Sequence, residues 1–196
     1  EYVRALTDAG LTVDEAFDAI MFRVSATTDQ FATIARLRAL RGLWSRVGEV
    51  LGVTEAKRGA IQHAVTSERQ ISRDDAYVNM LRGTISCFAA SAGGAEVQTV
   101  LPFDTAAGLP TDFSRRTARN TQVVLAEESN VGRVNDPAGG SWFVESLTKQ
   151  LSDKAWAVFQ GLDGEGFAAA LADGTVKAQL DEVNAARAAQ LATRKI

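Results

Sequence analysis

The sequence predicts an α/β fold in which short strands alternate with longer helices. Apolar runs of strand length occur at residues 19–24, 60–65 and 96–101. Each run is followed by a longer segment with apolar residues on one helical face. Connections of helix length join parallel neighbouring strands, so we expect a parallel sheet with crossover helices.

The first part of the chain contains two expected helices around the first strand. Residues 1–9 are expected to form a helix that ends at Gly10. Thr28 or Asp29 is expected to cap a long helix that closes at Gly52. The apolar stripe of this long helix consists of Phe31, Ile34, Leu37, Leu40, Trp44, Val47 and Leu51.

The rest of the chain repeats the alternation. A helix over about 74–92 is expected after the second strand, and another helix begins at Ser114 after the third. Residues 132–134 are a candidate fourth strand, very short, and Ser141 is expected to cap the helix that follows. Two more helices complete the tail.

Together these elements make about four βα units, which is half of a (β/α)8 barrel. An open sheet of Rossmann type fits the alternation as well, but no G-x-G-x-x-G follows any strand. Half a barrel cannot close, so its edge strands need the missing half or another chain.

Composition limits the function classes. The net charge of −3 disfavours nucleic-acid binding, which needs a clustered basic surface. The single Cys87 gives no disulfide framework, as expected in a reducing cytoplasm, and with the single His63 it cannot build a His/Cys metal site. No apolar run approaches the roughly 20 residues that span a bilayer. The first residues read as the middle of a helix without an initiator Met, which suggests a fragment of a longer chain.

One loop has two readings. Residues 136–141, Asp-Pro-Ala-Gly-Gly-Ser, lie where a strand end is expected to meet a helix start. The glycines and the helix N-terminus suit a phosphate-bearing ligand. A tight turn capped by Ser141 explains the same residues through turn chemistry alone.

Other polar residues also have a functional and a structural reading. His63 is expected near the C-terminal rim of the sheet, where barrel enzymes place their chemistry, or as an ordinary hydrogen-bonded strand residue. Glu127 and Glu128 are a candidate acid or ribose ligand, or a solvated helix end with Arg133 as partner. A solvated basic face is the default reading of the arginines on the long helix, which are Arg36, Arg38, Arg41 and Arg46.

Several motifs in order resemble the methylmalonyl-CoA mutase family over nearly all 196 residues. Residues 63–72 resemble the family phrase H-x-Q-T-S-G-W-S-L-T, and 95–101 its phrase T-Q-S-L-H-T-N. The match is tighter in Phe103-Asp104, Gly108-Leu-Pro-Thr111, Ala118-Arg-Asn-Thr-Gln122, Glu127-Glu-Ser129, and Asp136-Pro with Gly139-Gly-Ser141.

The resemblance implies adenosylcobalamin-dependent interconversion of methylmalonyl-CoA and succinyl-CoA, within propionate metabolism. It implies the C-terminal half of a (β/α)8 barrel over residues 1–160. Residues 161–196 would then be linker helices leading toward a cobalamin domain outside this sequence. The Tyr-His pair beside the substrate in catalytic members would lie just before Glu1.

The departures from the family pattern are concentrated where chemistry is expected. Val65 replaces Gln, Glu68-Arg69 replaces Gly-Trp, and Thr99 and Leu101 replace His and Asn. Ala138 replaces Trp in the Asp-Pro loop. Turn and helix-packing residues remain, so the resemblance is strongest to a small, non-catalytic subunit of a heterodimeric bacterial enzyme.

This interpretation assigns no catalytic residue and no metal ligand to the chain. It implies a cytoplasmic protein whose partner is the catalytic large subunit, with acyl-CoA and adenosylcobalamin bound at the level of the complex. The alternatives are a competent mutase chain and a different acyl-CoA mutase. A competent chain would bind substrate through His63, Thr66 and Ser67, and cofactor through Gln122, Glu127 and Glu128.

Overall fold

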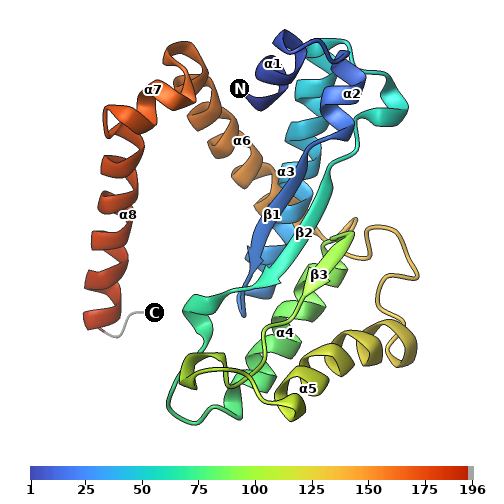
Figure 1. The fold of residues 1–196 in the computed structure, drawn as a ribbon, viewed down its shortest axis with the longest axis vertical. Coiled ribbons are helices and arrows are strands. Elements are labelled where there is room, and N and C mark those ends of the chain that lie inside the picture. Colours follow the sequence, from blue (N-terminus) through green and yellow to red (C-terminus); the bar gives the residue numbers. More distant parts are fainter. Residues whose placement is uncertain (194–196) are drawn as a thin grey trace.

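The computed structural model describes residues 1–193 as a mixed α/β structure built on a parallel sheet (Figure 1). The strands are β1 (Met21–Ala26), β2 (Ile61–Thr66) and β3 (Val97–Thr99), in the order β1-β2-β3. Both strand pairs are parallel. The structure thus confirms the α/β class and the three longer strands expected from the sequence.

The helices connect and flank the strands. In chain order they are α1 (Tyr2–Asp8), α2 (Val13–Asp18), α3 (Gln30–Leu51), α4 (Val78–Ala92), α5 (Asp112–Val123), α6 (Trp142–Glu165), α7 (Phe167–Ala172) and α8 (Thr175–Ala192). Single 3₁₀ turns lie at Glu55–Lys57, Glu68–Gln70 and Thr105–Ala107, and a π turn (Val124–Glu128) extends α5. None of the described helices has the length and apolarity needed to cross a bilayer.

Local signals explain several helix ends. The Asp29 side chain accepts a hydrogen bond from the Ala32 amide at the start of α3, and Gly52 closes that helix with φ of 75°. The sequence also contained a signal for α2 that we missed. Thr12 and Glu15 form a reciprocal capping box at its start.

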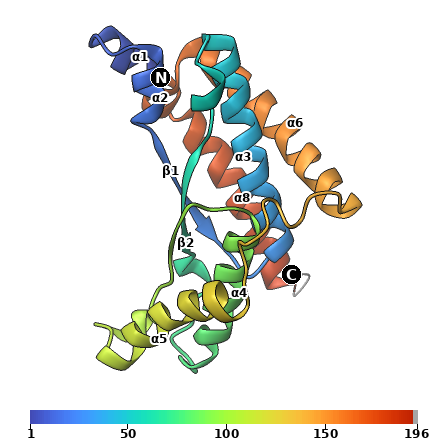
Figure 2. The same cartoon turned by 90° about the vertical axis from the view of Figure 1, so that its right-hand side faces the viewer.

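The sheet is covered on one face only. Figure 2 shows α3 and α4 together on one side of the strands. Alternate residues of β2 point to these helices, and Gln62, Ala64 and Thr66 are therefore buried. On the other face, Met21 and Arg23 of β1 are exposed. Helix α3 packs against α4 and, more extensively, against α6, so the covered face of the sheet and these three helices form the frame of the structure.

The expected fourth strand is not formed. Residues 132–134 lie in a series of turns, in which the Arg133 amide donates to the Asn130 carbonyl at 3.3 Å. Gly132 has φ of 98° and Asp136 φ of 48°, values incompatible with an extended strand. The described sheet therefore has three strands, and its closure into a barrel stays a prediction.

The tail extends away from the sheet. Arg4 pairs with Asp163 of α6 at 2.7 Å, and the Glu1 carboxylate accepts a hydrogen bond from the Ala168 amide of α7 at 3.1 Å. The first residues of the chain thus contact the junction between α6 and α7. Helix α8 has no buried residue and stands apart from the strands in Figure 1. Helix α6 runs through residue 160, where a boundary was predicted. Residues 194–196 of the predicted linker segment lie outside the described residues.

Candidate functional site

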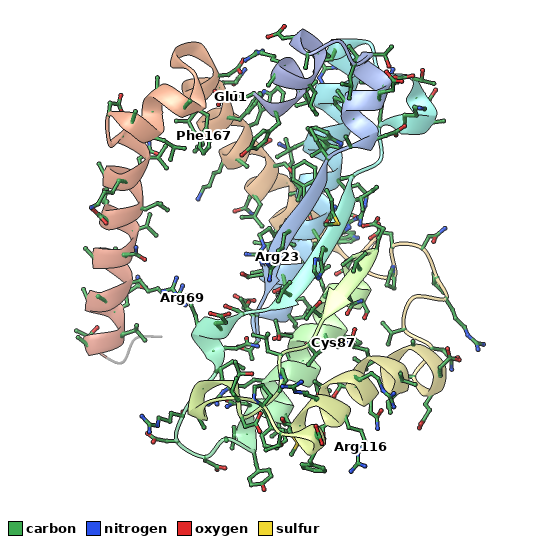
Figure 3. All side chains as sticks on the ribbon, viewed as in Figure 1. Glu1, Arg23, Arg69, Cys87, Arg116 and Phe167 are labelled. Carbon is green, nitrogen blue, oxygen red and sulfur yellow. The ribbon has the colours of Figure 1, made fainter. Side chains whose placement is uncertain are left out.

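The uncovered sheet face carries the one histidine. His63 lies on β2 opposite Arg23 of β1 and Val97 of β3 in the strand register. Its Nε2 atom is 2.9 Å from the hydroxyl oxygen of Thr99. Arg23, labelled in Figure 3, is exposed, and as the register partner of His63 it lies on the same face of the sheet. His63 is thus a hydrogen-bonded strand residue with one side open to whatever covers this face.

The other two candidate substrate residues belong to the frame. Thr66 is 3% exposed and lies on the helix-covered face, where its hydroxyl accepts a hydrogen bond from the Leu101 amide at 2.8 Å. Ser67 is buried, and its amide donates to the Ala26 carbonyl at 2.8 Å. These hydrogen bonds tie the end of β2 to β1 and to the segment after β3. Because alternate strand residues face opposite sides of the sheet, Thr66 and His63 lie on different faces.

Replacing Thr66 with valine tests this structural role. The change keeps the shape but leaves the Leu101 amide without its acceptor, so we expect unfolding to become easier by about 1–2 kcal/mol. Urea denaturation measures the loss, and Thr66→Ser, which keeps the hydroxyl, is the matched control. Equal midpoints for the valine and serine variants would contradict the assignment.

The candidate cofactor residues lie on and after α5. Gln122 lines a cavity of about 540 Å³ between α4, the strand β3 and the segment 131–137. Glu127 and Glu128 are exposed on the π turn beyond the helix. Arg133, predicted to pair with them, forms no ion pair with either glutamate in the described part of the chain. The three side chains therefore do not share a site with His63.

Cys87 also lines this cavity. It is buried, and its thiol donates to the Gln98 side-chain oxygen at 3.2 Å. Burial raises the pKa of the Cys87 thiol to about 11, so the thiol stays protonated near neutral pH. Cys87 is therefore a packing residue and not a nucleophile.

The loop at residues 136–141 is held by Arg38. The Arg38 side chain on α3 is only 12% exposed, and its Nε and Nη2 atoms donate to the Asp136 carboxylate at 2.8 and 2.9 Å. Nη2 also donates to Glu145 on α6 at 2.8 Å. One guanidinium thus joins three parts of the chain, and because both carboxylates surround it, the pKa of Arg38 is raised.

The glycine amides of this loop are already engaged. The Gly139 amide donates to the Asp136 carbonyl at 2.8 Å, and the Gly140 amide to the Glu145 carboxylate at 3.0 Å. The Ser141 side chain forms no capping hydrogen bond, contrary to expectation, and Glu145 supplies a partner instead. The phosphate interpretation therefore has no free donors at the two glycines, and the turn interpretation fits the geometry.

The long helix does not present a purely solvated basic face. Besides Arg38, Arg41 is engaged, since its Nη2 donates to the Gly94 carbonyl at 2.7 Å beside the end of α4. Arg36 and Arg46 fit the expected solvated face, because both are exposed and Arg46 pairs with its exposed helix neighbour Glu49. The contacts of Arg38 and Arg41 could not be predicted from the sequence, because their partners are 52 or more residues away along the chain.

Taken together, the polar groups of this chain mostly hold turns, strand ends and helix ends. Among residues 1–193, no group of three or more His, Cys, Asp or Glu side chains forms a potential metal site. The fold and its polar contacts define an α/β scaffold, built as a one-sided parallel sheet with crossover helices.

Comparison with known proteins identifies the scaffold. The family model described as methylmalonyl-CoA mutase matches residues 1–196, and the chain belongs to this family. It is 60% identical to the methylmalonyl-CoA mutase small subunit of Propionibacterium freudenreichii subsp. shermanii and 52% identical to that of Streptomyces virginiae, in both cases over all of this chain. It is 40% identical, over 94% of its length, to the methylmalonyl-CoA mutase of Escherichia coli. The chain spans about a third of the small subunits, 31% and 32% of their lengths.

Proposed function

We propose that this chain is part of the small subunit of a heterodimeric methylmalonyl-CoA mutase and supports a catalytic large subunit. The observation that carries the proposal is the 60% identity to a small subunit over the whole chain. The methylmalonyl-CoA mutase of Escherichia coli, whose name specifies no small subunit, is less similar, at 40% identity. Isomerisation of methylmalonyl-CoA to succinyl-CoA is then an activity of the complex.

The contacts of the family-like residues support a structural role. Asp104 accepts from both the amide and the hydroxyl of Thr111 at 3.1 Å, which fixes the turn before α5. Asn79 donates to the Ser72 and Phe103 carbonyls at 2.7 and 2.9 Å. Asp104 and Thr111, which belong to the family-like motifs, thus hold a loop in place, and Asn79 fixes the neighbouring loops.

The open sheet supports the barrel assignment. The strands are parallel and follow each other in chain order, as in a (β/α)8 barrel. The two outer strands have free edges, and one sheet face carries no helices, as expected for a segment of such a barrel. We assign residues 1–160 to the second half of a (β/α)8 barrel and 161–196 to the linker helices that follow it. In this arrangement His63 and Arg23 face the barrel interior.

Adenosylcobalamin belongs to the complex in this proposal. Glu127 and Glu128 are exposed on a turn, Gln122 faces a separate cavity, and the three do not converge with His63. The candidate residues therefore do not form a binding site for the cofactor among the described residues. Because the candidate substrate residues His63 and Thr66 lie on opposite faces of the sheet, they do not form a site for an acyl-CoA either. Both ligands are assigned to the large subunit.

One observation favours the alternative, a chain that is itself catalytic. His63 is on the bare face, with Thr99 as its hydrogen-bond partner and one side of the ring open. A substrate in the barrel interior would lie against this face and could contact the His63 side chain.

Turnover separates the two functions. The full-length chain, given methylmalonyl-CoA and adenosylcobalamin, is expected to produce no succinyl-CoA by itself and to support turnover once the large subunit is added. In the complex, His63→Ala is expected to leave kcat/KM unchanged. Turnover by the chain alone, or loss of activity in the His63 variant with the complex intact, would establish the catalytic alternative.

A further inference from the structure

Arg23 is a charged side chain without a charge partner on the uncovered face of the sheet. It lies on β1 and is exposed (Figure 3). Within residues 1–193 its guanidinium forms no ion pair. Arginine stays charged at every pH at which proteins fold, so whatever covers this face has to accommodate a positive charge.

The rest of this sheet face carries no acid. Register partners in parallel strands share a side, and alternate residues of each strand therefore line the same face. Besides Arg23, the residues on this face are Met21, Ser25, Ile61, His63, Val65, Val97 and Thr99. None of these side chains carries a negative charge.

The acids beyond the strand ends do not neutralise Arg23 either. Glu96, before β3, accepts a hydrogen bond from the Gln62 amide at 2.7 Å and lies 3.9 Å from Arg41. Glu68 is exposed on the turn after β2. Neither acid forms an ion pair with Arg23 in the described part of the chain. The negative charge that would balance Arg23 therefore comes from outside these residues.

The position of Arg23 along its strand favours a protein side chain as the partner. Arg23 is the third of the six residues of β1, and its register partner His63 is the third of the six in β2. Barrel enzymes bind their ligands at the carboxyl ends of the strands, whereas layers of packed side chains fill the middle of the barrel. A cation at mid-strand is thus placed to meet another strand.

The barrel assignment narrows the choice of strand, and this step rests on the proposed function. Each interior layer of a (β/α)8 barrel is built from alternate strands. As the first strand of the second half, β1 is the fifth strand, so it shares a layer with the first, third and seventh. The seventh strand is β3, which offers only Val97 and Thr99 on this face. The partner of Arg23 then lies on the first or the third strand.

We propose that Arg23 forms a buried ion pair inside the barrel with an Asp or Glu from the first or third strand of the same small subunit. Those strands belong to the part of the subunit outside this sequence, which spans 31% of the small subunit of Propionibacterium freudenreichii subsp. shermanii. Closure of the barrel removes Arg23 from water, and an unpaired charge there would be strongly destabilising. A side-chain pair at this position fills the barrel interior, in agreement with the assignment of acyl-CoA to the large subunit.

Chemical modification of the unaltered protein tests where Arg23 lies. The full-length small subunit is treated with phenylglyoxal, which modifies accessible guanidinium groups, and mass spectrometry identifies the modified arginines. Arg23 is expected to react about tenfold or more slowly than Arg115, an exposed residue of α5, because its modification then requires local opening. Equal rates at Arg23 and Arg115 would place Arg23 in water and overturn the proposal.

Substitution tests the pairing itself. Arg23→Met removes the charge at similar size and is expected to lower the melting temperature of the full-length small subunit by about 5 °C, because it leaves a buried carboxylate unpaired. Arg115→Met is the matched control and should leave the melting temperature unchanged. Replacing each acid of the first and third strands with an apolar residue of similar size should reproduce the loss at one position. Combining that change with Arg23→Met should restore most of the stability, because the pair is then removed as a whole.

The possible results are distinct. An unchanged melting temperature in Arg23→Met would overturn the ion pair. So would a loss, or a failure to fold, that no second change at an acid restores. If inorganic phosphate or acetate then stabilises the wild type but not Arg23→Met, the partner is a bound anion. Failure of the full-length chain to support turnover with the large subunit would refute the proposed function, which is read from activity, whereas the pairing is read from stability and modification.

Discussion

Replacing Arg38 with alanine is expected to destabilise the chain by about 2 kcal/mol, which corresponds to about 4–8 °C in melting temperature for a chain of this size. The guanidinium is 12% exposed, whereas Asp136 and Glu145 are 47% and 48% exposed. Loss of one partner of a fully buried pair costs roughly 3–5 kcal/mol. Water reaches both carboxylates here, so the cost is smaller.

The same variant has a defined dependence on pH. The hydrogen bond from Arg38, and then that from the Gly140 amide, hold the pKa of Glu145 below its ordinary value of 4.5. A carboxylate whose folded pKa is lowered stabilises the fold above its unfolded pKa, and this contribution is lost as the pH falls through the folded pKa. The difference in the free energy of unfolding between wild type and Arg38→Ala should therefore be largest near pH 7 and should decrease as the pH falls below 4.5.

A matched control separates the clamp from charge in general. Arg46→Ala removes an exposed pair one helix turn from its partner Glu49, and should change stability by less than about 0.5 kcal/mol. Arg38→Lys keeps the charge but cannot form the forked contacts to two carboxylates, and should recover only part of the loss. Melting curves measure all three. Equal melting temperatures for Arg38→Ala and Arg46→Ala would mean that the clamp does not stabilise the loop.

Shortening Leu37 to alanine is expected to cost about 3 kcal/mol, because the side chain is fully buried at the centre of the helix layer. Its surroundings cannot collapse easily, since the Leu37 carbonyl is held by the Gln62 side-chain amide at 3.1 Å. Chemical denaturation gives the change, and Leu180→Ala on α8, at a 58% exposed position, is the control.

Leu37 and Gly93 are expected to be coupled. A methyl group at Gly93 would come within 2.7 Å of Leu37 Cδ1, so Gly93→Ala should be destabilising by about 1–2 kcal/mol when Leu37 is present. In Leu37→Ala the same methyl would occupy vacated space. The double variant should therefore lose less stability than the two single losses together. Strict additivity would mean that the two positions do not share a packing contact.

Local patterns were sufficient for the long elements. Residues Asp29 and Gly52 marked both ends of α3, because a capping side chain and a positive φ are properties of a few neighbouring residues. The expected fourth strand at 132–134 was wrong, because three residues carry too little periodicity to outweigh a turn at Gly132. Helix α2 was missed, although its capping box, Thr12 with Glu15, was visible.

The sequence by itself determined the family, the α/β class and the approximate limits of the main strands and helices, because turns, caps and apolar periodicity act over a few residues. Only the tertiary structure decided which polar residues hold the frame. Arg38 meets Asp136 across 98 positions, and Thr66 meets Leu101 across 35, so neither contact has a local signature. The structure likewise separated His63 from Thr66, because alternate residues of a strand face opposite sides of its sheet.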